Sequence, residues 1–241
     1  MSAALEHAPA PFEHAQLERL ALFAGFITKI KHNPLRTVLP LTFRLLALLD
    51  AEIDFFAAYA PAYAEKRAAG ALSEERRIAL LEQQLDAFAA QRPPQVQALL
   101  RGVLAHEATV HRLVTSEASP GGEAASGIGW CGRAALGRYR VDVARACEAL
   151  RARRFAFDAD VVVRDQILLY RQLPERGEIA FFEIDELTWL LCSLVDGQRT
   201  PRDVAAAVAE LGFSSLAPAE VEAFFADAAQ RGYVTLGAAC A

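Results

Sequence analysis

Two histidines five residues apart are the nearest approach in this sequence to a metal-binding motif. His106 and His111 frame the run His-Glu-Ala-Thr-Val-His, which resembles the zinc motif with histidines at i and i+4. On a helix, an i+5 spacing turns the two imidazole rings about 140° apart, whereas i+4 places them on one face. The other histidines, His7, His14 and His32, are dispersed. We therefore expect no metal site in this chain and interpret the pair as residues of a helix surface.

The four cysteines do not form a reactive or structural cluster either. Cys131, Cys147, Cys192 and Cys240 have no close pairing, which fits neither a disulfide framework nor a zinc knuckle. Cys131 is a candidate nucleophile, but no histidine or carboxylate lies near it in the sequence to activate it. A Ser/His/Asp order, a glycine-rich phosphate loop and a convincing carboxylate pair are also missing. The sequence therefore predicts no catalytic site in this chain.

Composition and charge restrict the remaining possibilities. The 241 residues are 54% hydrophobic and 23% charged, which suits one large domain or two smaller ones with separate cores. No apolar run approaches the roughly 18 residues of a membrane span, and no secretory signal is visible, so we expect a cytoplasmic protein. The net charge of −5 is unevenly distributed along the chain, because residues 157–241 carry −8 and residues 1–156 carry +3.

The elements that would position a binding site are clearest in the last sixty residues. Two strand-like runs, 167–170 and 179–184, read as a hairpin, and a third run lies at 233–236. Between the hairpin and the last run, three apolar sets at i, i+3, i+4 and i+7 each precede a glycine, which is typical of short amphipathic helices with left-handed ends. The sets are Leu187, Leu190, Leu191 and Leu194 before Gly197; Val204, Ala207, Val208 and Leu211 before Gly212; and Val221, Phe224, Phe225 and Ala228 before Gly232.

This order predicts a winged-helix-like module, a type that binds DNA or peptides. A DNA-binding helix presents basic residues to phosphates. Here the third helix carries Glu220, Glu222 and Asp227 instead. A winged-helix transcription regulator stays possible, but the charge favours a peptide or protein ligand.

The first half of the chain is helical by pattern. Asn33 and Pro34 suit an N-cap and a first helical residue, Pro40 should kink or split the helix that follows, and the next apolar stripe runs to Pro61. Glycine, serine and alanine then dominate between residues 115 and 137 and indicate a domain joint. We therefore predict an α+β protein with a helical bundle at residues 1–115, a linker at 116–136 and the winged-helix-like domain at 137–241. Arginines at 138–154 form either a solvated helix face or a docking patch for an acidic partner or a peptide.

Specific residues resemble a known family. The runs Ile-Leu-Leu-Tyr-Arg at 167–171, Glu-Ile-Ala-Phe-Phe-Glu-Ile-Asp at 178–185 and Leu-Val-Asp-Gly-Gln-Arg-Thr at 194–200 resemble the PqqD-type precursor-recognition module of peptide-modifying enzymes. The segment Phe-Ile-Thr-Lys-Ile-Lys-His-Asn-Pro-Leu at 26–35, with Leu39-Pro40 and Thr42-Phe43, is similar to the MbnC family of accessory subunits of methanobactin biosynthesis.

The resemblance implies a non-catalytic subunit of a heterodimer with a TIM-barrel multi-iron oxidase. The pair would convert cysteines of a ribosomal precursor peptide to oxazolone and thioamide groups with O₂, and the iron would belong to the partner. An equivalent subunit for another iron oxidase that modifies peptide cysteines is the alternative within this architecture.

Two binding surfaces follow. An extended leader peptide would add to a strand edge formed by Ile179, Ala180, Phe181, Phe182 and Glu183, with a helix around Val221, Phe224 and Phe225 as the other wall of the groove. The sequence does not indicate which strand face lines that groove, and at least half of these phenylalanines must be core. We expect Ala180→Pro to remove a ladder donor and to abolish leader binding while the partner subunit stays bound. The oxidase would bind at the corner formed by Lys31, His32, Asn33, Pro34 and Leu35. The alternative is that this corner is only a structural N-cap.

Overall fold

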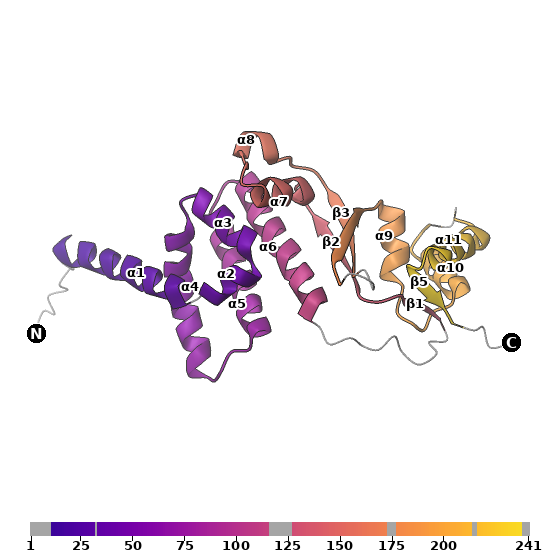
Figure 1. The fold of residues 1–241 in the computed structure, drawn as a ribbon, viewed down its shortest axis with the longest axis horizontal. Coiled ribbons are helices and arrows are strands. Elements are labelled where there is room, and N and C mark those ends of the chain that lie inside the picture. Colours follow the sequence, from indigo (N-terminus) through magenta and orange to yellow (C-terminus); the bar gives the residue numbers. More distant parts are fainter. Residues whose placement is uncertain (1–10, 32, 116–126, 173–176, 214–215, 238–241) are drawn as a thin grey trace, which may run out of the picture. The chain divides into compact units, whose positions relative to one another are not determined.

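The chain folds into two compact units in the computed structural model, which describes residues 11–31, 33–115, 127–172, 177–213 and 216–237 (Figure 1). The first, here called the helical unit, runs to Ala108 and includes Val143–Val163. The second, the sheet unit, comprises Thr109–Asp142 and the chain from Arg164 onward. Helices occur together with small antiparallel sheets, so the predicted α+β class is confirmed. None of the described helices is both long and apolar enough to cross a membrane.

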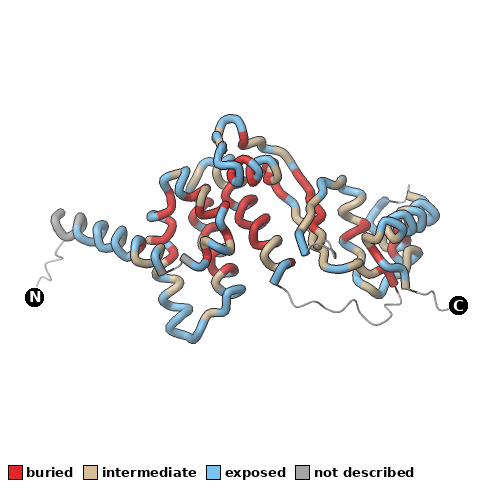
Figure 2. The backbone as a smooth tube through the Cα atoms, in the orientation of Figure 1, coloured by how far each residue is buried: buried red, intermediate tan, exposed pale blue. Residues whose placement is uncertain are grey.

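The helical unit is built around an aromatic core. Phe43 and Phe56 stack with ring centroids 5.6 Å apart, and Phe55 and Tyr59 are fully buried beside them. Figure 2 shows this core as the buried part of the helices. The helices are α1 (Pro11–Lys31), α2 (Asn33–Val38), α3 (Pro40–Leu48), α4 (Glu52–Ala68), α5 (Glu74–Ala89), most of α6 (Pro94–Thr115), α7 (Val143–Arg151) and α8 (Phe157–Asp160).

A buried carboxylate from α6 caps the start of α3. The two side-chain oxygens of Glu107 accept hydrogen bonds from the backbone N–H groups of Leu41 and Thr42 and from the Thr42 hydroxyl, each at 2.7 Å. These N–H groups belong to the first turn of α3 and have no partner within their own helix, and the helix dipole favours a negative charge there. Burial raises the pKa of Glu107, while the three hydrogen bonds act in the opposite direction. Glu107 thereby joins two helices that are 65 residues apart in the sequence.

Prolines and a serine set several of the helix boundaries. As predicted, Pro40 separates two helices: α2 ends at Val38, and the proline begins α3. The Ser73 side chain accepts from the Arg76 N–H and caps α5. The expected end at Pro61 is wrong, because α4 continues through this proline to Ala68.

The sheet unit contains the predicted hairpin and the three short helices. Its strands are β1 (Ile128–Trp130), β2 (Ala134–Tyr139), β3 (Gln166–Gln172), β4 (Ile179–Glu183) and β5 (Val234–Leu236), and its helices are α9 (Glu186–Ser193), α10 (Pro201–Glu210) and α11 (Pro218–Gln230). The strands form an antiparallel sheet in the order β2-β3-β4 and a separate antiparallel pair, β1 with β5. Gly197, Gly212 and Gly232 have φ values of 82°, 95° and 68°, so the predicted left-handed positions are confirmed. The connection between β3 and β4 lies largely outside the described residues.

The division into units differs from the predicted boundaries in two places. The part of the expected linker that the structure describes is not a simple joint, because β1 and the start of β2 fall inside it. Residues 143–163, expected in the C-terminal domain, belong to the helical unit. There the buried Cys147 and Leu150 contribute to the apolar face of α7.

Candidate functional site

The hydrogen-bond ladder decides which backbone groups of β4 point outward from the sheet. The Ile184 N–H donates to the Ile167 carbonyl at 3.0 Å. In an antiparallel pair, bonded and non-bonded residues alternate, so Phe182 and Ala180 also bond toward β3. The N–H and C=O groups of Phe181 and Glu183 point the other way, toward the outer edge of the sheet. Ala180 is therefore a ladder donor to β3, so proline at position 180 would remove a hydrogen bond within the sheet and not one that β4 offers to a peptide.

The same alternation assigns the two faces of β4. Phe182 is paired with Leu169, and both side chains line a cavity in front of α11. Phe181 lies on the opposite face, where its ring is 5.9 Å from that of Tyr170. On this opposite face, the buried hydroxyl groups of Tyr170 and Tyr139 are 2.6 Å apart. The sequence did not indicate which face of β4 lines the groove. The structure shows that it is the face of Ala180, Phe182 and Ile184.

The cavity beside β4 has a volume of about 250 Å³ and lies wholly within the sheet unit. Its walls come from β1, β3, β4, α9, α11 and the start of β5. They are formed by Trp130, Leu169, Phe182, Ile184, Thr188, Cys192, Phe224, Phe225, Asp227, Ala228, Arg231, Tyr233 and Val234. We call this cavity with the adjoining edge of β4 the groove. Its lining is mainly apolar, which is typical of a site for a side chain or a small ligand.

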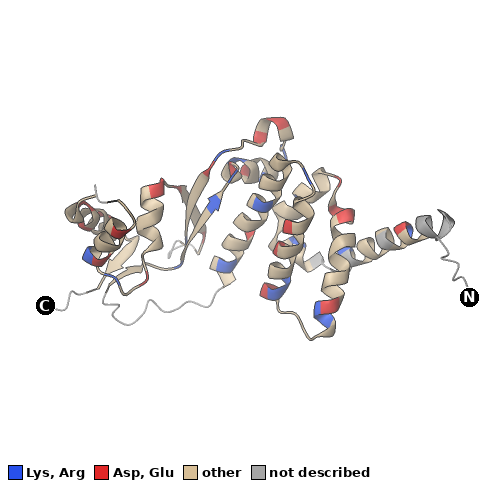
Figure 3. Cartoon of the chain, turned by 180° about the vertical axis from the view of Figure 1, so that it is seen from behind, with Lys and Arg blue, Asp and Glu red and all other residues tan. Residues whose placement is uncertain are grey.

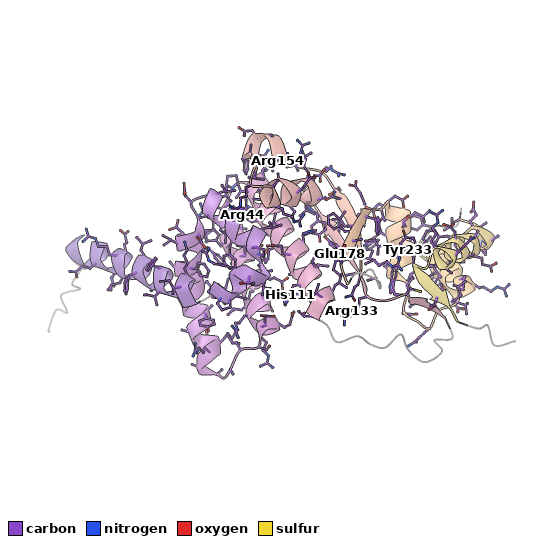
Figure 4. All side chains as sticks on the ribbon, viewed as in Figure 1. Arg44, His111, Arg133, Arg154, Glu178 and Tyr233 are labelled. Carbon is purple, nitrogen blue, oxygen red and sulfur yellow. The ribbon has the colours of Figure 1, made fainter. Side chains whose placement is uncertain are left out.

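Aromatic rings form the walls of the groove. The Phe182 ring meets the Tyr233 ring edge-on at 6.3 Å, and Phe182 remains 41% exposed. The rings of Phe224 and Phe225 cross at 83° with centroids 5.1 Å apart. Behind Tyr233, the guanidinium group of Arg171 lies 4.7 Å from the ring centroid, close enough for a cation–π contact. Figure 4 labels Tyr233 at this position. The groove therefore offers a partly exposed aromatic surface that an apolar side chain can cover.

Ion pairs fix the charged residues around the groove. Arg164 donates to both oxygens of Glu183, at 2.6 and 2.7 Å, and to Asp142. Hydrogen bonds from Arg164, and next from Gln166, lower the pKa of the Glu183 carboxyl to about 2. On α11, Asp227 pairs with Arg231. The Glu183 carboxylate is thus occupied by hydrogen bonds from Arg164 and Gln166. What this residue offers a ligand is therefore mainly its backbone N–H and C=O groups.

The structure brings together part of the predicted peptide-binding set. Phe182, Phe224 and Phe225 line one cavity, whereas Val221 is fully buried in the core of the sheet unit. Phe225 is itself fully buried, so it shapes the floor of the cavity instead of meeting solvent. Ile179 lies with Phe181 on the opposite face of β4. The partly exposed members that face the cavity are therefore Phe182 and Phe224.

Sequence reasoning missed Trp130, Thr188, Arg231 and Tyr233 as lining residues. Trp130 offered a signal, because a tryptophan in a glycine-rich segment is usually docked against something. Its place in the groove follows from the pairing of β1 with β5, where Trp130 lies opposite Val234. This contact joins residues more than one hundred positions apart, which no local pattern reveals.

At the predicted oxidase-binding corner, the structure describes Pro34 and Leu35 but not His32 or the side chains of Lys31 and Asn33. Pro34 is exposed, and Leu35 is buried at 1% exposure, so Leu35 packs inside the helical unit. Next to this corner, Glu52 is almost fully buried and is paired with Lys29 and Arg36. Burial, and next the neighbouring Arg36, lowers the pKa of Lys29.

Among the residues that the structure describes, no group of three or more His, Cys, Asp or Glu side chains is placed to hold a metal ion. His106 is 2% exposed, so its interpretation as a surface residue is wrong, whereas His111 is half-buried. Burial, and next the nearby Arg151, lowers the pKa of His106 to about 4. His106 is therefore a neutral core residue near neutral pH.

Comparison with known proteins leaves the family open. The chain matches no protein-family model, and no curated protein matches it significantly.

Proposed function

We propose that this chain is the peptide-recognition subunit of a heteromeric iron-dependent oxidase of the methanobactin type. In this proposal the sheet unit is a winged-helix-like module of the PqqD type, and the leader of a ribosomal precursor peptide binds in the groove. The partner subunit holds the iron and converts peptide cysteines to oxazolone and thioamide groups. The observation that carries the proposal is the outer strand β4 beside an aromatic cavity walled by α11. The groove suits an equivalent subunit of another oxidase of peptide cysteines equally well.

An extended peptide fits this geometry by adding a strand to β4. Its backbone would pair with the outward groups of Phe181 and Glu183, and every second side chain would face the cavity. Each backbone hydrogen bond contributes only about 0.5 to 1.5 kcal/mol. Ordering the peptide offsets much of that gain, so the cavity must supply selectivity. Burying one large apolar side chain there contributes roughly 1.5 to 3 kcal/mol.

The acidic third helix does not favour the alternative of a DNA-binding regulator. α11 carries Glu220, Glu222 and Asp227 and contains no lysine or arginine. A helix that approached phosphates would bring these carboxylates against like charge. The groove face of the same helix is aromatic, which suits a peptide side chain.

The test of peptide recognition compares Phe181→Pro with Phe181→Ala. Both variants lose the same ring, but only the proline variant lacks the N–H that points to the sheet edge. We expect Phe181→Pro to bind the leader of the precursor peptide at least about fivefold more weakly than Phe181→Ala, because one or more ladder bonds are lost.

Affinity is measured by fluorescence anisotropy with the labelled leader peptide. Co-purification of both variants with the oxidase, at equal yield, controls for folding. Equal peptide affinity of the two variants would contradict strand addition at β4, and no binding of the leader to the wild-type chain would contradict the proposed function itself.

A further inference from the structure

Three of the elements that frame the groove lack basic residues. β4, α9 and α11 contain no lysine or arginine, while they carry Glu183, Glu186, Glu220, Glu222 and Asp227 (Figure 3). Glu178 adds a further exposed carboxylate just ahead of β4 (Figure 4). The Glu183 carboxylate lies on the face opposite the cavity, so the negative charge that a ligand along β4 and α11 meets comes from Glu178 and from the carboxylates of α11.

Three arginines that reach this region from neighbouring segments are each engaged with a carboxylate of β4, α9 or α11. Arg231 pairs with Asp227 at 2.9 Å, and Arg164 holds Glu183. Arg138 pairs with Glu186 and lies over the Trp189 ring at 4.6 Å. A fourth arginine beside the groove, Arg171, lies against the Tyr233 ring and donates to the Gly232 carbonyl.

Two carboxylates on the groove side remain for a ligand, because Glu222 is two positions from Phe224 and points to another side of α11. Within the described part of the chain, neither Glu178 nor Glu220 has a lysine or arginine partner, and both are exposed. Glu220 accepts one hydrogen bond, from the Ala217 N–H at 2.8 Å. It lies one turn before Phe224 on α11, so its carboxylate is on the same side of the helix as the aromatic wall. Glu178 immediately precedes Ile179, the first residue of β4.

We propose that the groove selects an extended peptide segment with one bulky apolar side chain for the cavity and with lysine or arginine at the positions that flank it. This inference rests on the proposed function and names the chemistry of its ligand. The apolar side chain covers Phe182, Phe224 and Tyr233, and the basic residues neutralise Glu178 and Glu220. An acidic segment of the same hydrophobicity is repelled.

The experiment uses the full-length protein and three fluorescein-labelled synthetic peptides of about eight residues, the length of an ordinary strand. All three share a central isoleucine, and they differ only in the flanking residues, which are lysine, glutamine or glutamate. We expect the lysine peptide to bind more tightly than the glutamine peptide by up to about fivefold for each flanking charge. The difference should vanish in about 1 M salt, where charges are screened within about 3 Å.

Matched protein variants locate the effect. Glu178→Gln and Glu220→Gln should each weaken binding of the lysine peptide and leave the glutamine peptide unchanged, because glutamine keeps the size and the oxygen acceptor. Glu210→Gln removes an exposed carboxylate from α10, which does not line the cavity, and should change neither affinity. Equal or tighter binding of the glutamate peptide would overturn this inference but not peptide recognition. If none of the peptides binds while the precursor leader does, the inference is equally overturned.

Discussion

His106 illustrates how burial changes what a titratable residue does. It lies on α6 beside Glu107 and near Arg151, and burial holds its imidazole in the neutral form. In the unfolded chain the same imidazole takes up a proton near pH 6.5. Between the two pKa values the unfolded state binds more protons, so stability must fall as the pH falls. The buried Glu107 acts in the opposite sense, because its pKa is raised.

This difference gives a pH-dependent prediction. His106 should remove about 3 kcal/mol from the free energy of unfolding between pH 6.5 and pH 4. His106→Asn keeps a polar side chain that does not titrate, so its stability should fall less over this range. Urea denaturation of both proteins at several pH values measures the effect. The contribution of Glu107 is present in both proteins and cancels in the comparison. If stability falls equally with pH in the two proteins, His106 is not buried in its neutral form.

At the scale of elements, α1 has an apolar surface that the helical unit does not cover. Gly25 lets the helix approach α4 closely, since a Cβ there would lie 2.9 Å from the Ile53 carbonyl oxygen. Beyond this contact, large apolar side chains along α1 are 47% to 62% exposed. They are Leu17, Leu20, Leu22, Phe23, Phe26 and Ile30. If the proposed function holds, this surface and the neighbouring Pro34 would form the docking face for the oxidase.

We expect Leu20→Ser with Phe23→Ser to weaken the complex with the oxidase by at least about tenfold, because two large apolar side chains leave the interface. Gln16→Ser, an exposed polar change on the same helix, should leave the complex intact. Co-purification with the tagged oxidase, followed by iron analysis, measures the outcome. An intact complex with the double variant, together with unchanged circular dichroism, would exclude α1 as the docking face.

The elements also show how far local pattern reaches. The short helices α9, α10 and α11 and their glycine ends were predictable because periodicity and left-handed stops are local properties. The ladder phase of β4 was not, since Ala180 and Phe181 are equivalent until the register with β3 is known. For the same reason β1 was missed: its three residues form a strand only through pairing with β5. The cavity depends on the β3–β4 register and on the β1–β5 pairing. Of its lining residues, the sequence therefore predicted only Phe182, Phe224 and Phe225.

At the scale of the whole molecule, α7 and α8 interrupt a β-hairpin. Tyr139 at the end of β2 pairs with Gln166 at the start of β3, and the Asp142 and Arg164 side chains are in contact at 2.9 Å. The chain between them, residues 143–163, belongs to the helical unit. A cut at residue 115 would therefore leave the apolar face of α7 without its partners, so the predicted boundary at that position does not separate the units cleanly.

An altered boundary should give an independent sheet unit. We expect residues 127–241, with 143–163 replaced by about four glycine and serine residues, to fold as a soluble monomer, because Asp142 and Arg164 are already neighbours. The same fragment with residues 143–163 retained should aggregate through the exposed Val143, Ala146 and Leu150. Size-exclusion chromatography and amide exchange of β3 compare the two. Aggregation of the shortened fragment alone would contradict this division.

The interrupted hairpin also imposes an order on synthesis. Domains ordinarily fold from the N-terminus as the ribosome extends the chain. Here the N-terminal unit lacks α7 until residue 163 has emerged, by which time β1 and β2 are already exposed. β2 has no partner until β3 follows, and β1 waits for β5 at the end of the chain. Both units thus wait for later segments, so a nascent chain of this protein exposes at least one unpaired strand from the emergence of β1 until β5 follows.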